Sequence, residues 1–415
     1  MKLVTFVKAG EERLGLFAGE TVIDPLLATG SPEVFGSAST FIRSGLVGLD
    51  AANAMLVHPP REATTALKDM TLTAPIRPAT ILCSGSNYRD HNAEKANTPI
   101  SGKEPEFFVK TADCVVGPNE PIVFDERFSK KIDCETELAI VIGKPGRFIE
   151  TSRALEHVFG YTIVNDVTAR DRQVRKTPEG MTWYELGSGK AFDSGAPLGP
   201  CIVTADEIGD PQNLKVMSRI NGELRQSSNT SNMIWSCAEL IHFFSRNFTL
   251  KPGMVIITGT PAGTAWSADK ELGGKGVTQP GLVPATRYCL PGNVVECEVE
   301  KIGVLRNPIA RASARDLSTR PNRSFAEQTC QRRGNRPVRG NEITPGRMEM
   351  HRRRFLQGAL VGSTFASPMI APFFFVCRGA GLALAQHHYR CPVSAGRTGR
   401  SRSTPGGAGA REASR

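Results

Sequence analysis

Residues 131–144 read KIDCETELAIVIGK, a stretch that ends in the apolar run LAIVI. Asp133, Glu135 and Glu137 precede or enter this run at a spacing of two. In a β-strand, residues two apart point to the same face. The pattern therefore predicts a strand that carries three carboxylates on one side at the point where it becomes apolar enough to be buried.

A further carboxylate follows a second apolar run, in YTIVNDVTARDRQ (161–173), where Asp166 stands at the end of a predicted strand. An isolated E-x-E pair is typical of the solvated face of an amphipathic strand, but here the strand turns apolar at once. Glu135, Glu137 and Asp166 supply hard oxygen ligands, with no Cys pair or clustered His beside them. We therefore expect these three residues to bind Mg²⁺, Mn²⁺ or Ca²⁺ rather than zinc.

The charge of the chain is unevenly distributed. Its 415 residues carry a net charge of +10, but residues 310–415 contain 19 Arg and five acidic residues, a net +14. Residues 1–309 therefore carry −4. The basic character belongs to the C-terminal part, so we predict no nucleic-acid partner for residues 1–309.

The ten cysteines are scattered singly, without a C-x-x-C pair. This spacing argues against a zinc or redox motif and favours reduced thiols in a reducing compartment. The N-terminal MKLVTFVKAG has no long apolar segment, so we predict a cytoplasmic protein with no membrane contact through residues 1–309.

Composition and turn signals predict four parts. A small β-rich domain occupies residues 1–70, and a main domain occupies residues 72–309. A disordered Arg/Pro/Ser-rich linker follows (310–347). Residues 348–415 resemble a twin-arginine export signal and a low-complexity tail. We interpret this last part as foreign to the enzyme. The alternatives are an added membrane anchor and a disordered tail that binds a partner.

The main domain has many short strand patterns and few helical ones, in no regular βαβ order. Helices are expected near RDHNAEKA, SRALEHVF, TARDRQV and SCAELIHFFSRN, and Asn221-Gly222 predicts a hairpin turn. This arrangement indicates a β-rich α+β domain.

Three further motifs carry polar groups. In SGSNYRDHNAEKAN (84–97), Asn87 is expected to cap a short helix that places His91 and Glu94 on one face. A carboxylate beside an imidazole orients the ring and raises its basicity. Lys190 lies between Gly189 and Gly195 in GSGKAFDSG, and the turn TGTPAGT (258–264) could hold a substrate carboxylate with its backbone N–H groups.

Together these motifs resemble the fumarylacetoacetate hydrolase family over about residues 75–309. The resemblance rests on six ordered patterns, G-x-N-Y-x-x-H-x-x-E, D-x-E-x-E-L-A-x-V-I-G, F-G-Y-x-x-x-N-D-x-x-A-R-D-x-Q, G-K-x-F-D, N-G-E-x-R-Q and T-G-T-P-A-G. It implies a mixed β-sandwich roll, a homodimer, and one Mg²⁺, Mn²⁺ or Ca²⁺ per subunit.

The resemblance also implies roles for single residues. It assigns the metal to Glu135, Glu137 and Asp166, and catalysis to His91, Glu94 and Lys190. His91 and Glu94 would lie on a lid that activates water. Residues expected to contact substrate oxygens or support the site are Arg170, Gln173, Thr260 and Gly259. Two segments depart from the family pattern and border this site: VRKTPEGMTWYELGSG (174–189) and residues 267–289.

The reaction expected first is hydrolysis of a C–C bond in a β-diketo acid such as an acylpyruvate, giving a carboxylic acid and a 2-oxo acid. The alternatives on the same fold are an oxaloacetate-type decarboxylase, a hydroxy-dienedioate isomerase and a ureidoglycolate lyase. An alternative of another class is a non-catalytic protein that binds metal and ligand. The expected partner is a small dicarboxylic or 2-oxo acid.

Overall fold

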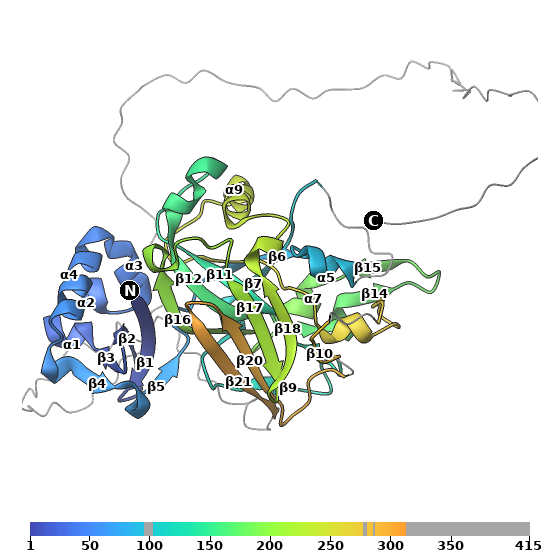
Figure 1. Ribbon diagram of the computed structural model, residues 1–415, viewed down its shortest axis with the longest axis horizontal. Coiled ribbons are helices and arrows are strands. Elements are labelled where there is room, and N and C mark those ends of the chain that lie inside the picture. The colour runs from blue at the N-terminus through green and yellow to red at the C-terminus, as the bar shows by residue number, and fades with distance from the viewer. Residues whose placement is uncertain (95–102, 277–279, 285–286, 313–415) are drawn as a thin grey trace, which may run out of the picture. The chain divides into compact units, whose positions relative to one another are not determined.

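The structure is a computed structural model that describes residues 1–94, 103–276, 280–284 and 287–312. Two large β-sheets dominate it (Figure 1), which confirms the expected β-rich α+β class. The larger sheet has 12 strands, ten of them on one continuous path. In spatial order these ten are β4 (Thr64–Ala66), β3 (Thr21–Ile23), β2 (Glu11–Ala18), β1 (Lys2–Lys8), β16 (Ala196–Thr204), β12 (Val158–Asn165), β11 (Thr136–Ile142), β19 (Val255–Ile257), β6 (Thr80–Gly85) and β7 (Glu106–Thr111).

Two short strands join this sheet off the main path: β5 (Thr71–Thr73) pairs with β1, and β8 (Val115–Val116) pairs with β16. The second sheet has five strands, in the order β18 (Glu223–Asn229), β17 (Lys215–Ile220), β20 (Val294–Val299), β21 (Gly303–Arg311) and β9 (Ile122–Phe124). Two-stranded ladders join β10 (Ile132–Asp133) to β13 (Thr168–Ala169) and β14 (Val174–Lys176) to β15 (Thr182–Tyr184).

Strand β11 is buried on both faces. Leu138, Ile140 and Ile142 belong to the apolar cluster that β17, β20 and β21 also enter, whereas Ala139 and Val141 belong to the cluster on the opposite face. This double burial explains why the run LAIVI is continuously apolar instead of alternating.

The predicted hairpin is confirmed. β17 and β18 are antiparallel, and the turn between them has Asn221 at φ 53° and Gly222 at φ 82°. Positive φ at both turn residues is the geometry that Asn-Gly favours.

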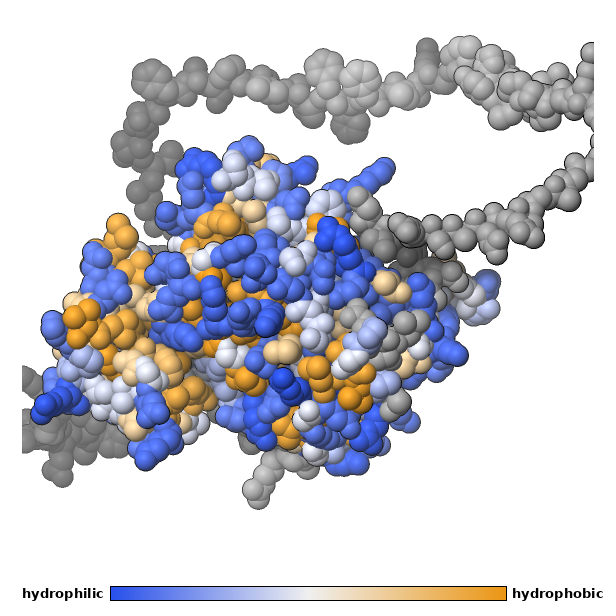
Figure 2. Space-filling view, viewed as in Figure 1, coloured by the Kyte–Doolittle hydropathy of each residue, from blue (hydrophilic) through white to orange (hydrophobic). Residues whose placement is uncertain are grey.

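The N-terminal strands do not form a sheet of their own, because β1 pairs with β16 and so extends the larger sheet. They are accompanied by four helices, α1 (Pro25–Thr29), α2 (Pro32–Phe35), α3 (Ala38–Ser44) and α4 (Leu46–Val57), the blue elements of Figure 1. This part is thus less strand-rich than expected. Figure 2 shows apolar residues gathered over this end, and the exposed ones include Leu27, Leu46, Val47 and Val57.

The remaining helices are short except for one: α5 (Arg89–Ala93), α6 (Arg170–Gln173), α7 (Leu186–Lys190), α8 (Ala205–Ile208) and α9 (Cys237–Asn247). Ser236 and Glu239 form a capping box that starts α9, and residues such as Leu240 and Phe244 bury its apolar face. The helix expected at SRALEHVF is a 3₁₀ helix, Thr151–His157. Among the described residues, no helix is both long and apolar enough to cross a membrane.

The seven cysteines before residue 310 are free and buried, as predicted. The last strand runs to Arg311, where Ala310 and Arg311 pair with Val123 and Phe124 of β9, two residues beyond the expected end of the main domain. The linker and signal-like segment lie outside the described residues from 313 onward, so these two domain assignments stay predictions.

Candidate active site

Three carboxylates meet beside the paired strands β11 and β12. Glu135 precedes β11, Glu137 lies within it, and Asp166 follows β12. The register Thr136↔Asn165 places these ends together, and the Asp166 N–H donates to the Glu135 carbonyl at 2.8 Å. One oxygen from each carboxylate lies within 4.8 Å of the others, and all three residues are buried.

Asp133 does not share this position. The chain leaves β10 after Asp133 and enters β11 only at Thr136, so the continuous strand expected over this stretch is interrupted. The Asp133 carboxylate instead accepts the N–H groups of Ala265 and Trp266 at 2.9 and 3.1 Å and the Nε of Arg170 at 2.9 Å. The expectation of three carboxylates on one strand face is therefore wrong for Asp133.

Two cations predicted from the sequence lie against the carboxylate cluster. Lys190, at the end of α7, places Nζ 2.5 Å from Glu135 Oε2 and 2.6 Å from Asp166 Oδ2. Arg170 donates from Nη2 to Glu135 Oε1 and from Nη1 to Gln173 Oε1. All three guanidinium nitrogens of Arg170 thus bond to protein groups, so Arg170 orders its carboxylate neighbours as well as lining the pocket.

A third cation, Lys110 of β7, was not predicted. It is fully buried, and its Nζ lies 2.8 Å from Asp166 Oδ1 and 2.7 Å from the Gly195 carbonyl, and it also donates to the Lys190 carbonyl. The only signal in the sequence is a lysine at an inward position of the alternating strand EFFVKT.

The charges in this cluster are unequally compensated. Burial, followed by the nearby Asp166 and Glu135, raises the pKa of Glu137 well above its usual value. Burial opposes ionisation of Glu135 too, but Arg170 and Lys190 outweigh it and hold the pKa of Glu135 below its ordinary range. A bound divalent cation would relieve the repulsion at Glu137, and three carboxylates are the hard ligands that such a cation takes. The cluster therefore fits a divalent metal.

His91 and Glu94 meet as expected. His91 Nδ1 lies 3.3 Å from Glu94 Oε2, and Glu94 Oε1 accepts the Gly263 N–H at 2.8 Å. Burial, which removes solvent from the carboxylate, raises the pKa of Glu94 to about 8. The part of the proposed lid from residue 95 to 102 lies outside the described residues.

The capping role expected for Asn87 is wrong. The residue before α5 is Tyr88, which makes no side-chain cap. The Asn87 side chain instead donates to the carbonyls of Trp235 and Thr258 and accepts the Trp235 N–H, all within 2.9 Å. These bonds tie the start of α5 to the Gly-rich turn, a long-range role that local sequence could not reveal.

The Gly-rich turn directs its N–H groups to protein carboxylates. Gly259 donates to Glu137 at 2.6 Å and Gly263 donates to Glu94 at 2.8 Å. These two N–H groups are therefore bonded to protein carboxylates and do not form the substrate-binding turn that we expected. Thr260 reaches the pocket, while its Oγ1 accepts from Gln226 at 2.8 Å and donates to the Thr136 carbonyl at 3.2 Å.

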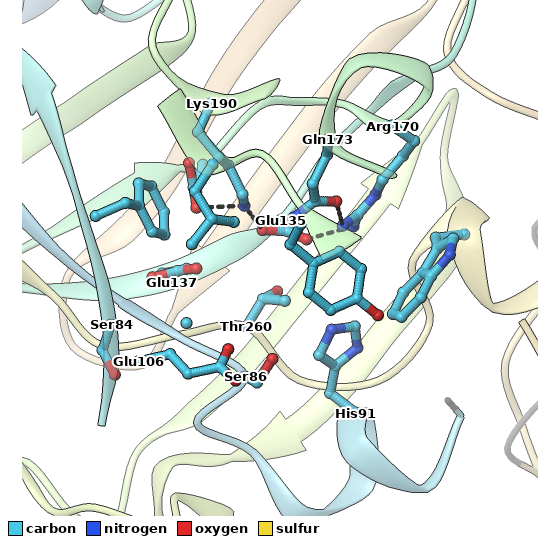
Figure 3. Close-up of a pocket in the computed structure, with 16 residues that line it drawn as sticks. Ser84, Ser86, His91, Glu106, Glu135, Glu137, Arg170, Gln173, Lys190 and Thr260 are labelled. Carbon is cyan, nitrogen blue, oxygen red and sulfur yellow. Dashed lines mark hydrogen bonds and ion pairs between the residues drawn. The ribbon is translucent and has the colours of Figure 1, made fainter. Parts of the chain in front are cut away.

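One pocket collects most of these groups (Figure 3). It is lined by the predicted residues His91, Glu135, Glu137, Asp166, Arg170, Gln173, Lys190 and Thr260. It is also lined by residues that the sequence did not single out: Ser84, Gly85, Ser86, Glu106, Phe108, Tyr184, Leu186 and Trp266. Of the predicted site residues, Gly259 and Glu94 stand behind the lining rather than in it.

Two of the unexpected residues come from segments that depart from the family pattern or border them. Tyr184 ends β15 within the first departure, and Trp266 immediately precedes the second. Their rings meet edge to face at 6.3 Å, and the Trp266 ring also lies 5.9 Å from the His91 ring. The sequence predicted only that the two segments departing from the family pattern border the site, and it did not predict this pair of aromatic rings.

Comparison with known proteins agrees with the geometry. The sequence model described as fumarylacetoacetate (FAA) hydrolase C-terminal matches residues 80–310. A curated relative from Bos taurus, "Oxaloacetate tautomerase FAHD2B, mitochondrial", is 42% identical over 242 residues, which are 58% of this chain and 70% of the relative.

Solved structures share the fold. A fumarylacetoacetate hydrolase from Exiguobacterium antarcticum is 34% identical with a TM-score of 0.59, over 75% of this chain and 100% of its own. A maleylpyruvate hydrolase from Sphingobium sp. SYK-6, solved with manganese(II) and pyruvate, is 25% identical with a TM-score of 0.57 over the same shares.

Proposed function

The chain belongs to the fumarylacetoacetate hydrolase family, and from this premise we propose that it is a divalent-metal-dependent enzyme that interconverts the enol and keto forms of an oxaloacetate-like 2-oxo dicarboxylic acid. The Bos taurus relative, which is named an oxaloacetate tautomerase, supports this choice among the reactions of the family. It replaces C–C hydrolysis, which we expected first, as the leading reaction.

The observation that carries the proposal is the buried contact between His91 Nδ1 and Glu94 Oε2 at 3.3 Å. Because the pKa of Glu94 is about 8, its carboxylic acid donates to His91 Nδ1 at neutral pH. A neutral imidazole whose Nδ1 accepts a hydrogen bond holds its own proton at Nε2. His91 is then set up to give a proton, which suits ketonisation better than activation of water.

Ketonisation requires a proton to be added at C3 while the enol oxygen loses one. In the proposed step, His91 gives its Nε2 proton to C3 and takes the Glu94 proton at Nδ1. The Glu94 carboxylate left behind accepts the Gly263 N–H, which stabilises its charge. The enol proton passes to solvent, and a solvent proton taken up at His91 Nε2 lets Nδ1 return its proton to Glu94.

Three other groups would assist this step. A cation bound by Glu135, Glu137 and Asp166, for which we propose Mg²⁺, supplies Lewis-acid stabilisation of charge on the 2-oxo oxygen. Lys190 adds a buried positive charge beside the same cluster. Arg170 and Gln173 provide the polar side of the pocket toward which a second carboxylate can turn.

The test follows the ultraviolet absorbance of the enol after enolic oxaloacetate is added to purified protein with Mg²⁺. We expect the decay to accelerate above the rate with Mg²⁺ and buffer alone, and the acceleration to disappear with excess chelator. No acceleration by the protein would overturn the proposal.

Hydrolysis of an acylpyruvate is the second candidate, because ionised Glu94 would make His91 a base toward water. The maleylpyruvate hydrolase of similar fold supports it. Release of pyruvate from a panel of acylpyruvates, faster than enol decay under the same conditions, would favour this reaction. A homodimer and a cytoplasmic location stay predictions.

A further inference from the structure

One side of the pocket is built from neighbouring strands that the reaction above does not use. Ser84 and Gly85 end β6, and Glu106 begins β7 directly opposite Gly85 in the antiparallel register. A Cβ at Gly85 would lie 3.4 Å from Oε2 of Glu106, so this carboxylate lies over Gly85 of β6. Figure 3 shows Ser84 and Glu106 on the side of Glu137 away from Lys190 and Arg170.

The two sides differ in charge. Around the metal cluster, the carboxylates of Asp133, Glu135 and Asp166 form buried ion pairs with Lys110, Arg170 and Lys190, and the Glu137 carboxylate, which accepts the Gly259 N–H, lies beside them. The four carboxylates and three cations together carry a net charge of −1, and a bound divalent cation changes this net charge to +1. Glu106, in contrast, makes no hydrogen bond or ion pair within the described ranges, and the Ser84 hydroxyl is buried without a hydrogen-bond partner there.

We propose that Glu106 is a specificity-determining residue, which excludes a negatively charged group from the Ser84 side of the pocket. A dicarboxylic 2-oxo acid would then turn its second carboxylate toward Arg170 and Gln173. The Ser84 side would receive a neutral group or a hydrogen-bond donor. The inference rests on the proposed function, since it assigns the orientation of that substrate.

The physical basis is like-charge repulsion in a half-enclosed site. Two carboxylates a few ångströms apart in such a place repel strongly enough to change binding by about tenfold. The carboxylate of Glu106 accepts hydrogen bonds and donates none, so it discriminates against carboxylates and in favour of hydroxyl groups.

The test compares Glu106→Gln with the parent by calorimetry at saturating Mg²⁺, with two ligands of equal carbon number. 2-Oxoglutarate ends in a carboxylate, and 2-oxopentanoate ends in a methyl group. We expect the variant to bind 2-oxoglutarate about tenfold more tightly relative to 2-oxopentanoate than the parent does. Asp113→Asn is the matched control, because Asp113 is an exposed acid just after β7 and outside the pocket.

The outcomes are distinguishable. A ligand ratio that stays within twofold of the parent, or that shifts equally in Asp113→Asn, overturns the role of Glu106 alone. A loss of Mg²⁺ affinity in Glu106→Gln would place this residue in the metal site and also overturn it. A parent that binds Mg²⁺ but neither 2-oxo acid overturns the proposed function together with this inference.

Discussion

Glu135, Glu137 and Asp166 stand on or beside two central strands, whereas Tyr184 and Trp266 stand on connections that leave the larger sheet. The first group is held by buried ion pairs and by the β11–β12 register. In the second group, the two rings contact each other edge to face, and Trp266 also donates hydrogen bonds to Asp133 and to the Leu272 carbonyl. The difference teaches that the charged centre is fixed by the sheet, while the shape of the pocket is set by segments that can change without disturbing it.

The largest effect should come from the sheet-borne cluster. Asp166→Asn removes one of three anionic ligands, takes from Lys110 its carboxylate partner, and leaves Lys190 with Glu135 alone. We expect the affinity for Mg²⁺ to fall by roughly 100-fold or more, measured by calorimetry. Glu135→Gln should act in the same direction. Affinity that stays near that of the parent would show that the cation binds elsewhere.

His91→Ala should have the next largest effect. Loss of the group that moves the proton should slow enol decay by roughly 10²- to 10⁴-fold, while Mg²⁺ affinity stays at the parent value because His91 is outside the carboxylate cluster. Both quantities can be measured on one preparation. A variant that keeps the parent rate would remove His91 from the mechanism.

The pH profile tests the state of Glu94. Since the active form for ketonisation contains protonated Glu94, the rate should fall as pH rises through about 8, and hydrolysis of an acylpyruvate should instead rise there. Glu94→Gln cannot titrate, so its rate should be lower but flat across this range. A parent profile that is flat from pH 6 to about 9.5 would contradict a pKa of about 8.

The smallest effect is expected in the aromatic pair of Tyr184 and Trp266. Tyr184→Leu trims an aromatic contact with Trp266 but removes no charged group from the cluster. KM should rise about three- to tenfold with kcat nearly unchanged, since the lost contact is worth about 1 kcal/mol. An equal loss in kcat would mean that Tyr184 and Trp266 also position the reacting groups. The proposed difference between the carboxylate cluster and the aromatic pair would then be wrong.

The sequence was informative where a local pattern and a physical role coincide. The run LAIVI, the Asn221-Gly222 turn and the helical spacing of apolar residues in SCAELIHFFSRN each specify their element through nearby residues. The metal cluster could be proposed because Glu135 and Glu137 interrupt a buried strand with charges that need a counter-ion.

Other features could not be read locally because their partners are distant in sequence. Asn87 bonds to Trp235 and Thr258, and Lys110 reaches Asp166, so neither role is visible from neighbouring residues. Asp133 does not lie on the predicted strand face, because β10 ends at Asp133 and β11 begins only at Thr136. The raised pKa of Glu94, on which the proposed choice between the two reactions depends, comes from burial that only the folded chain provides.

The pairing of β1 with β16 also bears on how the chain folds during synthesis. Thr5–Val7 of β1 can pair with β5 once residue 73 has emerged, but Lys2 and Leu3 lie opposite Val203 and Ile202, so about 200 residues must leave the ribosome before this end of the β1 edge is covered. The β1–β2 hairpin can form early, but the exposed edge of β1 is a template for pairing with other chains in the meantime. Slow elongation or early termination between these strands should therefore favour aggregation, and chaperone demand should peak before β16 emerges.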